Sequence, residues 1–373
     1  MRFENLPTPC YVVDEVKLLK NLRLLKQIQD DTGCKILLAQ KAFSMFSEYP
    51  LMRGYLSGTT ASSLFEARLG AEEMGGETHI FAPAYKDAEF DKIAALCEHI
   101  VFNSFAQLVK YRSRCGRASI GLRINPERST QDHVIYDPCA PGSRLGITAT
   151  NFRPELLDGV EGLHFHTLCE QDADALAVTL DAVEEKFGKW LPRMKWLNMG
   201  GGHHITREGY DLELLESCIR RMREKYGLEI YLEPGEAVAL NAGHFVTEVM
   251  DIVENSGISS LILDGSAACH NPDVLEMPFR PPVNGAGLPN EKAYTYRLSA
   301  FTCLAGDVFG DYSFDERVKI GDRLRFDNFA IYTMVKNNTF NGIQLPSIAI
   351  MAENGDCRIV RSFGYEDFKS RLS

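Results

Sequence analysis

The sequence of 373 residues has no apolar run long enough to cross a bilayer, and no two of its ten cysteines are spaced as CxxC. The first absence argues against a membrane-spanning helix. The second argues against a zinc ribbon or a thioredoxin-like redox site. The N-terminal segment MRFENLPTPCYVVDE carries charges where a signal peptide needs its apolar region, so we expect a cytoplasmic protein with free thiols.

Basic residues are also fewer than acidic residues. Lys and Arg number 40 against 51 Asp and Glu, which leaves a net charge of −11. A nucleic-acid binder that grips phosphates needs the opposite balance, so we exclude that class. The acidic excess suits a small cationic partner. The hydrophobic fraction of 45% is ordinary for a soluble globular protein, and the length predicts two or three domains.

Before residue 240 the sequence alternates between short β-rich runs and helical stretches. Apolar residues lie at helical spacing over 18–28, 176–187 and 212–222, and a glycine follows each stretch. This alternation predicts an α/β fold, and eight strands are the number that closes a (β/α)₈ TIM barrel rather than an open doubly wound sheet. The predicted barrel strands are 35–40, 58–63, 78–84, 99–104, 119–125, 161–167, 196–201 and 229–234.

After about residue 245 the pattern changes to strands separated by Gly, Pro and Asn turns. We predict a barrel domain over 25–245 and a second, mostly β domain built from 1–24 and 246–373. A connection from Asn125 to about Glu161 is long enough to be functional or disordered. The strands predicted for the second domain are 247–254, 259–266, 292–301, 322–328, 330–335 and 347–352.

Catalytic groups of a barrel lie at the carboxyl ends of its strands. One of these ends carries Lys41, which follows the apolar run ILLAQ. Burial lowers the pKa of a lysine and makes its amine a nucleophile, whereas a surface lysine extends its ammonium into water; both interpretations stay open from this residue alone. The strand-end residues are Lys41, Ser62, Ser63, His166, Gly200, Gly201, Gly202 and Glu233.

Four of these features suit a single ligand. The amides of Gly200 to Gly202 can hold a phosphate, although three glycines also suit a tight turn. The His166 imidazole can lie against a planar ring, and Glu233, in the sequence EPG, can bind a protonated ring nitrogen or be a solvated loop acid. With the Lys41 amine bound to an aldehyde, these groups match the needs of pyridoxal 5'-phosphate.

Two other classes of function compete with this interpretation. His164 and His166 lie two apart on a strand and point to the same side, so they could bind a metal in a barrel hydrolase. A binding module that stores pyridoxal phosphate or a polyamine is the second alternative. Because the metal pair lacks an obvious acidic partner apart from Glu233, we predict a site without a metal.

An ordered set of motifs resembles the fold-type III pyridoxal-phosphate decarboxylases, which have an alanine-racemase-like barrel and include ornithine and diaminopimelate decarboxylases. The resemblance extends over nearly the whole chain, from TPCYVVDE to FNG. Its motifs are AQKAF with Lys41, TTASSLFE with Ser63 and Glu66, HFHTLCE with His166, NMGGG with Gly200 to Gly202, EPGEA with Glu233, LDGS with Asp264, FTCLAGDVFGDY with Cys303 and Asp307, NFAIYT with Tyr332, and FNG with Phe340.

Within this family, FTCLAGDVFGDY and LDGSAACHNPDVLEMPFRPP look like the carboxynorspermidine decarboxylase branch. The resemblance implies decarboxylation of carboxynorspermidine or carboxyspermidine to norspermidine or spermidine, with diaminopimelate or ornithine as alternative substrates. It also implies a homodimer whose β-rich domain supplies the dimer interface and Cys303, the general acid, to the partner's site. Tyr332 would bind the phosphate and Ser63 the cofactor.

Two departures from the family pattern concern the substrate. Ornithine decarboxylases read EPGR, with the arginine on the phosphate, whereas Glu236 stands at that position here and is available for a cationic substrate. The amino-acid decarboxylases carry an acid after the catalytic cysteine, whereas this chain has Leu304. The distal amine must therefore find another partner. The predicted substrate-binding residues are Glu236, Asp264, Asp273, Glu276 and Asp307.

Overall fold

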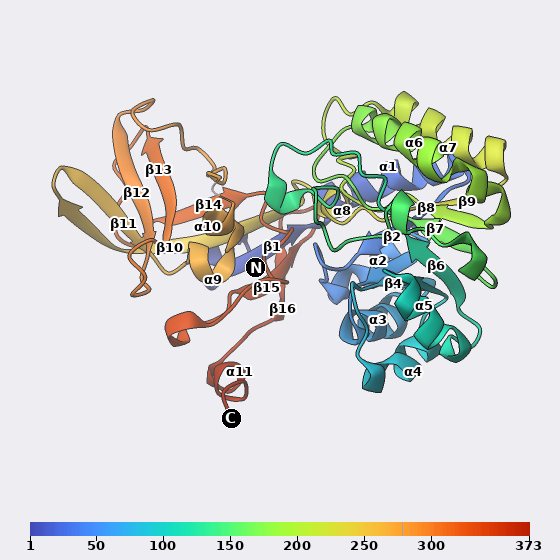
Figure 1. The fold of residues 1–373 in the computed structure, drawn as a ribbon. Helices are drawn as coiled ribbons and strands as arrows, with labels where there is room; N and C mark the ends of the chain where they lie inside the picture. The colour runs from blue at the N-terminus through green and yellow to red at the C-terminus, as the bar shows by residue number, and fades with distance from the viewer. Residues whose placement is uncertain (278) are drawn as a thin grey trace. The chain divides into compact units, whose positions relative to one another are not determined.

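The computed structural model describes residues 1–277 and 279–373 of the chain. These residues form two compact units. The barrel unit consists of Asn21–Val238, and the sheet unit joins Met1–Lys20 to Ala239–Ser373. Figure 1 shows the helices and strands of both units.

The barrel unit contains eight parallel strands in a closed ring, which confirms the predicted fold and all eight predicted strands. Strand β2 pairs with β9 and closes the ring, with Lys35 opposite Tyr231 and Ile36 opposite Leu232. The strands are β2 (Lys35–Ala39), β3 (Gly58–Ala61), β4 (Glu77–Phe81), β5 (His99–Phe102), β6 (Ser119–Arg123), β7 (Gly162–His164), β8 (Trp196–Asn198) and β9 (Glu229–Leu232).

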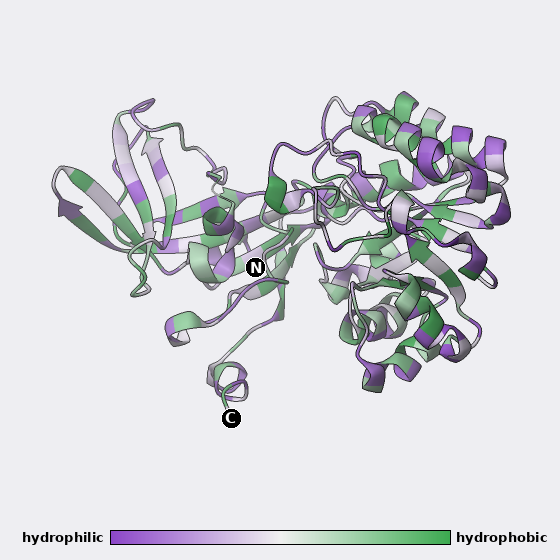
Figure 2. Cartoon of the chain, viewed as in Figure 1, coloured by the Kyte–Doolittle hydropathy of each residue, from purple (hydrophilic) through white to green (hydrophobic). Residues whose placement is uncertain are grey.

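Helices follow most of the barrel strands, with their polar faces outward in Figure 2. Gly33 and Gly227 both have φ +69°, so a left-handed glycine ends α1 and α7 as predicted. α6 also ends where predicted, at Phe187, but Gly188 keeps a right-handed φ of −53° and the chain continues into a 3₁₀ turn. The helices are α1 (Glu15–Thr32), α2 (Tyr49–Met52), α3 (Leu64–Leu69), α4 (Asp87–Leu96), α5 (Phe105–Tyr111), α6 (Ala173–Phe187), α7 (Leu212–Tyr226) and α8 (Glu236–Ala239).

Large side chains from alternate strands fill the barrel interior. Trp196 lies against His99, with ring centroids 4.5 Å apart, and its Nε1–H donates to the Ser119 hydroxyl at 2.9 Å. This packing is possible because Gly162 on the neighbouring strand has no side chain where the indole lies. The barrel is therefore a packed core, and ligands have access only at its ends.

The sheet unit is an eight-stranded sheet in the order β13-β12-β11-β10-β1-β15-β16, with β14 paired to β10. Tyr11, Phe245, Phe309 and Phe326 form the centre of its core, and each is at most 2% exposed. Three short helices, α9 (Ala267–His270), α10 (Asp273–Glu276) and α11 (Tyr365–Lys369), complete it. The strands are β1 (Cys10–Asp14), β10 (Gly243–Asn255), β11 (Ile258–Leu263), β12 (Tyr294–Ala300), β13 (Val308–Phe314), β14 (Arg323–Asp327), β15 (Ser347–Met351) and β16 (Cys357–Arg361).

One predicted strand of this unit is wrong and three strands were not predicted. Residues 330–335 form turns, because Tyr332 has a left-handed φ of +50° and the Thr333 hydroxyl donates to the Phe329 carbonyl at 3.0 Å. The omitted strands are β1, β13 and β16. Gly310 and Asp311 break the apolar pattern of β13, and Arg358 and Arg361 leave β16 with little apolar sequence. Tertiary pairing with β12 and β15 decides these segments.

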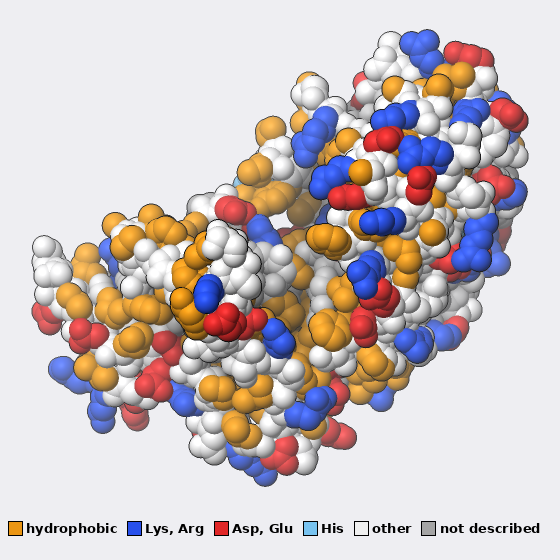
Figure 3. Space-filling model, turned by 90° about the horizontal axis from the view of Figure 1, so that it is seen from below, with side chains coloured by type: hydrophobic (Ala, Val, Ile, Leu, Met, Phe, Trp, Pro, Cys, Tyr) orange, Lys and Arg blue, Asp and Glu red, His pale blue; other side chains and the backbone are white. Residues whose placement is uncertain are grey.

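The surface carries both signs of charge. On the face seen in Figure 3, Lys and Arg side chains are interspersed with Asp and Glu side chains. Over the described residues, none of the helices is both long enough and apolar enough to cross a membrane.

The contact between Gly162 and Trp196 gives a test of the barrel packing. A Cβ added to Gly162 would lie 2.0 Å from the Trp196 ring, so we expect Gly162→Ala to lower the free energy of unfolding by about 1–3 kcal/mol through overpacking. Urea denaturation followed by fluorescence and circular dichroism measures this change. Gly54→Ala is the matched control, because its nearest atom lies 3.7 Å from the added Cβ. Equal stability of the two variants would contradict the proposed packing constraint.

Candidate active site

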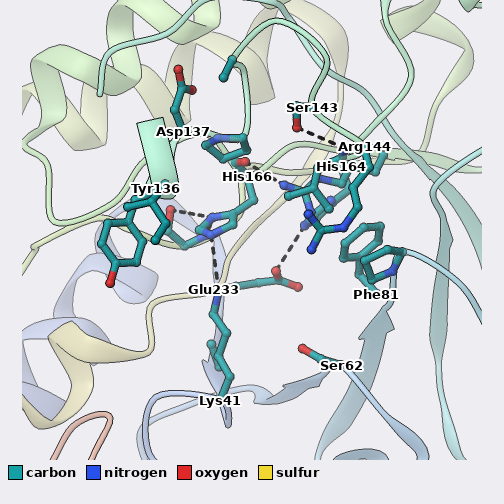
Figure 4. A pocket seen from close by; sticks show the side chains of 18 of the residues that line it. Lys41, Ser62, Phe81, Tyr136, Asp137, Ser143, Arg144, His164, His166 and Glu233 are labelled. Atoms are coloured by element: carbon teal, nitrogen blue, oxygen red, sulfur yellow. Dashed lines mark hydrogen bonds and ion pairs between the residues drawn. The ribbon is translucent and has the colours of Figure 1, made fainter. Parts of the chain in front are cut away.

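The carboxyl ends of the barrel strands surround a cavity of about 490 Å³ (Figure 4). Lys41 enters it two residues after β2, His166 two residues after β7, and Glu233 directly after β9. Ser62 and Gly201 also line it, so most of the predicted strand-end residues share one cavity. The ring of parallel strands brings these residues together although the sequence separates them widely.

Lys41 points toward His166, with 3.5 Å between Lys41 Nζ and His166 Nε2. The lysine side chain is exposed to the cavity. Burial and the Arg123 charge lower the pKa of Lys41, against opposing contributions from Glu233, Cys169 and Glu66. A larger fraction of the amine is therefore neutral and nucleophilic than in a solvated lysine, as the sequence predicts.

Glu233 is a charged carboxylate in a buried position, 9% exposed. Its Oε1 accepts a hydrogen bond from Asn198 Nδ2 at 2.8 Å, and its Oε2 lies 3.3 Å from His164 Nε2. Burial alone would raise the pKa of this group, but the His164 and Asn198 contacts outweigh burial and hold the pKa at about 2. The carboxylate can therefore stabilise a positive charge placed in the cavity at neutral pH.

Arg123 and His166 complete the electrostatics of the cavity. Burial lowers the pKa of Arg123 to about 10, so the guanidinium remains charged at neutral pH. Its Nη2 donates to the His166 carbonyl at 2.9 Å, and the group lies 4.5 Å from the Phe81 ring centroid. Burial, Lys41 and Arg123 together hold the pKa of His166 well below its usual value. His166 therefore offers a neutral imidazole face.

Arg123 and Phe81 are two cavity residues that sequence reasoning missed. Each is the last residue of its strand, β6 and β4. The strand-end rule that selected Lys41 and Glu233 also applies to them, and Arg123 lies in the quoted run SIGLRIN. The missed signal was therefore present in the sequence.

Each glycine of the turn after β8 has a structural role. Gly200 and Gly202 have φ +69° and +84°, and an added Cβ at Gly202 would lie 2.0 Å from the Leu168 carbonyl oxygen. The Gly200 N–H donates to Asn198 Oδ1 at 2.9 Å, and the Gly201 N–H to His166 Nδ1 at 3.0 Å. Among the described residues, the Gly202 N–H has no acceptor, so it is the amide of this turn available to a bound anion.

Ser63 caps a helix at this end of the barrel. Its hydroxyl accepts a hydrogen bond from the Glu66 N–H at 3.3 Å, and the Glu66 carboxylate accepts one from the Ser62 N–H at 2.6 Å. Burial raises the pKa of Glu66. Of the two serines it is Ser62 that lines the cavity.

The long connection predicted from Asn125 onward forms one wall of the cavity. Residues Val134 to Leu145 contribute, and Arg144 faces the opening (Figure 4). Asn103 fixes this wall, because its Nδ2 donates to the Arg144 carbonyl at 2.8 Å and its Oδ1 accepts from the Gly146 N–H at 2.7 Å. The loop is therefore an ordered part of the site.

Of the remaining predicted residues, Glu236 begins α8 in the barrel unit, with its Oε1 3.2 Å from His204 Nε2, and the others belong to the sheet unit. Cys303 has an exposed thiol, and its N–H donates to Asn341 Oδ1 at 2.8 Å. Asp307 is 2% exposed. Its carboxylate accepts hydrogen bonds from the Ser266 hydroxyl and the Thr302 hydroxyl, both at 2.6 Å, and from the Ala268 N–H at 2.9 Å. Asp307 thus orders the segment that carries Cys303.

The other acids of the sheet unit also have partners there. Asp273 and Glu276 on α10 both pair with Lys336, at 2.7 Å for Glu276. Asp264 accepts from the Thr247 hydroxyl at 2.5 Å and from the Glu248 N–H at 2.8 Å. Tyr332 lies in the turn that replaces the predicted strand.

The cavity fits a planar, anionic pyridoxal phosphate. It offers a lysine amine, a neutral imidazole face and an ionised carboxylate. The Gly202 amide, which has no acceptor among the described residues, follows the lining residue Gly201 in the chain. The metal alternative finds no such support. The two groups of potential metal ligands within the described residues are Glu77, His79 and His99, and Glu170, His204 and Glu236, and neither includes His164 or His166.

Comparisons with known proteins agree with this geometry. The family described as "Pyridoxal-dependent decarboxylase, C-terminal sheet domain" matches residues 10–330. The chain is 44% identical to a carboxynorspermidine/carboxyspermidine decarboxylase of Campylobacter jejuni, with 100% of both chains covered. It is 42% identical to a carboxyaminopropylagmatine decarboxylase of Synechocystis sp., with 100% of this chain and 97% of the relative covered.

The chain is also similar to a solved decarboxylase structure. The crystal structure of carboxynorspermidine decarboxylase from Campylobacter jejuni, complexed with norspermidine, matches with a TM-score of 0.92 and 43% identity. The match covers 98% of this chain and 100% of that one. The chain therefore belongs to the pyridoxal-dependent decarboxylase family.

Proposed function

We propose that the chain decarboxylates carboxynorspermidine, carboxyspermidine or both, using pyridoxal 5'-phosphate, and so supplies norspermidine or spermidine in polyamine biosynthesis. The convergence of Lys41, His166 and Glu233 on one cavity is the observation that carries this proposal. The full-length relatives named for this activity support the choice of substrate. Cytoplasmic location is part of the same proposal.

The barrel unit holds the cofactor in this proposal. Lys41 would hold the aldehyde, because its lowered pKa makes the amine available as a nucleophile. Glu233 would favour a protonated ring nitrogen, and the His166 imidazole would offer its face to the ring. The Gly200 to Gly202 turn, with its Gly202 amide, and Tyr332 would hold the phosphate. Ser63 would contribute to the cofactor site by capping α3.

The reaction breaks the bond between the substrate Cα and its carboxylate. The bound cofactor supplies an electron sink for the pair of electrons released as carbon dioxide leaves. The Cys303 thiol then donates its proton to Cα as general acid and recovers a proton from solvent. Its exposure suits this role within a homodimer, in which Cys303 of the partner subunit completes each site.

Acidic residues select the polyamine arm in the proposed complex. Glu236, Asp264, Asp273 and Glu276 are the candidate partners for its ammonium groups. Asp307 acts differently, because its carboxylate already accepts three hydrogen bonds and orders the Thr302–Cys303 segment. We therefore assign Asp307 a positioning role.

A second candidate substrate is carboxyaminopropylagmatine. The Synechocystis relative named for that activity is nearly as similar, at 42% identity against 44%. This substrate ends in a guanidinium where carboxynorspermidine ends in a primary ammonium. The chemistry at Cα is the same, so only the recognition of the distal end separates the two activities.

Lys41→Ala should abolish turnover and the visible absorbance of the bound cofactor together, because the covalent link is lost. Borohydride reduction followed by peptide mapping should place the adduct on Lys41 in the wild-type protein. Lys92→Ala, which removes an exposed lysine of the same unit, should leave both unchanged. A reduced adduct on another residue, or none, would overturn the proposal.

Cys303→Ala should slow product formation by about 10²–10⁴-fold, the usual contribution of a general acid, while cofactor binding survives. Stopped-flow absorbance and the release of carbon dioxide measure the two effects separately. Cys218→Ala, on α7, serves as a thiol control in the barrel unit. Wild-type kinetics and product in the Cys303 variant would remove its assigned role.

Turnover across five substrates tests the substrate choice. We expect kcat/KM to be highest for carboxynorspermidine or carboxyspermidine, and at least about tenfold lower, or 1.4 kcal/mol, for diaminopimelate and ornithine. Carboxyaminopropylagmatine completes the series. If it has the highest kcat/KM, the second candidate replaces the first.

A further inference from the structure

Asn198, the last residue of β8, lies between two parts of the cofactor site that have separate tasks in the proposed function. The residue is 1% exposed. Its Nδ2 donates to Glu233 Oε1 at 2.8 Å, and its Oδ1 accepts from the Gly200 N–H at 2.9 Å. One side-chain amide therefore connects the buried carboxylate to the first glycine of the turn after β8.

These two contacts fix the orientation of the Asn198 amide. The Gly200 N–H is a donor, so the amide oxygen faces the turn and the amide nitrogen faces Glu233. The reverse orientation would place a donor against the Gly200 N–H and an acceptor against an ionised carboxylate. Aspartate lacks the donor at this position and leucine lacks both groups, so the two contacts require an amide.

The backbone around Asn198 holds the amide in place. The strand register sets Asn198 opposite His164 of β7 and Tyr231 of β9, and its carbonyl accepts from the Phe165 N–H at 3.0 Å. On the turn side, a Cβ added to Gly200 would lie 2.3 Å from the Phe165 carbonyl oxygen. The amide thus lies between a close-packed turn and a strand that is paired on both sides.

His164 is a second neighbour of Glu233, but its side chain has no bond to the turn. Its Nε2 lies 3.3 Å from Glu233 Oε2 (Figure 4), and its buried Nδ1 has no hydrogen-bond partner within residues 1–277 and 279–373. Both side chains support the ionised carboxylate, and of the two it is Asn198 that also contacts Gly200. The two residues therefore form a matched pair for an experiment.

We propose that Asn198 is a positioning residue that couples the two ends of the cofactor site, because it orders both Glu233, the acid for the ring nitrogen, and the glycine turn that receives the phosphate. This inference rests on the proposed function and adds Asn198 to it. Contacts to the ring and to the phosphate then strengthen each other, since one amide orders both. Removal of the amide should weaken both contacts, whereas removal of His164 should weaken only the contact to the ring.

Binding of pyridoxal and of pyridoxal 5'-phosphate to the cofactor-free full-length protein separates the two contacts. The ratio of the two dissociation constants measures what the phosphate contributes. Asn198→Leu should weaken pyridoxal 5'-phosphate binding by about 10–150-fold, the range for a lost hydrogen bond to a charged group. It should also lower the ratio by about fivefold or more, because the buried Gly200 N–H loses its acceptor.

His164→Leu is the matched comparison. It should weaken the binding of both ligands, because Glu233 loses one of its polar neighbours. The ratio of the two dissociation constants should stay within about twofold of the wild-type ratio, since the glycine turn keeps its contact with Asn198.

Asn198→Asp gives a readout that a purely structural residue would not change. The introduced carboxylate keeps an acceptor for the Gly200 N–H and lies beside Glu233, so the two acids share a proton near neutral pH. In the wild type the pKa of Glu233 is about 2, so this group stays ionised at neutral pH. Cofactor affinity of the variant should therefore fall as the pH falls from about 8 to about 5, with the phosphate ratio unchanged.

The other groups around Glu233 are the same in this variant and in the wild type, so a new pH dependence comes from the introduced acid. Asn151→Asp adds the same charge to an exposed residue of the barrel unit and should keep the wild-type pH dependence. The charged and titratable groups that face Glu233 are Lys41 after β2, His79 of β4, His99 of β5, Arg123 of β6 and His164 of β7.

Two outcomes would overturn the inference. They are equal changes of the phosphate ratio in the two leucine variants, and a wild-type pH dependence of cofactor affinity in Asn198→Asp. Thermal midpoints identify any variant that fails to fold, and Asn198→Asp decides alone if Asn198→Leu does not fold. The proposed function is tested separately: a wild-type protein that binds neither ligand rejects it, whereas wild-type binding with equal ratios in the two leucine variants rejects only the role of Asn198.

Discussion

Closure of the barrel by the pairing of β2 with β9 is the constraint on which the site depends. Only two residue pairs form this seam, Lys35 with Tyr231 and Ile36 with Leu232. Because the strands are parallel, the seam brings the end of the first barrel strand beside the end of the last. Lys41 and Glu233 lie at those ends, so backbone pairing on the ring sets the geometry of the two charged groups.

Charge balance inside the cavity follows from this geometry. Lys41 and Arg123 oppose Glu233 and Glu66, while His166 remains neutral between them. Glu233 stays ionised in a buried position because Asn198 and His164, from the two strands before it, approach its oxygens. The neighbouring strands thus provide the polar contacts that an isolated buried carboxylate would lack.

The two units contribute different chemistry in the proposed enzyme. The barrel unit supplies the cofactor site, on loops that follow its strands. The sheet unit supplies an exposed thiol on a segment that the buried Asp307 orders. The similarity to decarboxylases of both carboxynorspermidine and carboxyaminopropylagmatine suits this division, because Cα chemistry can stay constant while distal recognition changes.

The sequence by itself determined the eight barrel strands, the long helices and the strand-end positions of Lys41, His166 and Glu233. Apolar runs of strand length, helical spacing and terminal glycines are local signals, and they act within a few residues. The same rule extended to Arg123 and Phe81, although the sequence prediction did not apply it there. Local signals failed at residues 330–335, where composition suggests a strand and turns form.

Only the tertiary structure decided the partners of these residues. It showed that Ser62 rather than Ser63 lines the cavity, that Asp307 is occupied by three donors, and that Glu170 meets Glu236 beside His204. Strands such as β13 and β16 likewise form because a neighbour offers hydrogen bonds. The physical reason is the same in each case: side-chain and strand pairing depend on segments far apart in the chain, and residue spacing alone does not encode which ones meet.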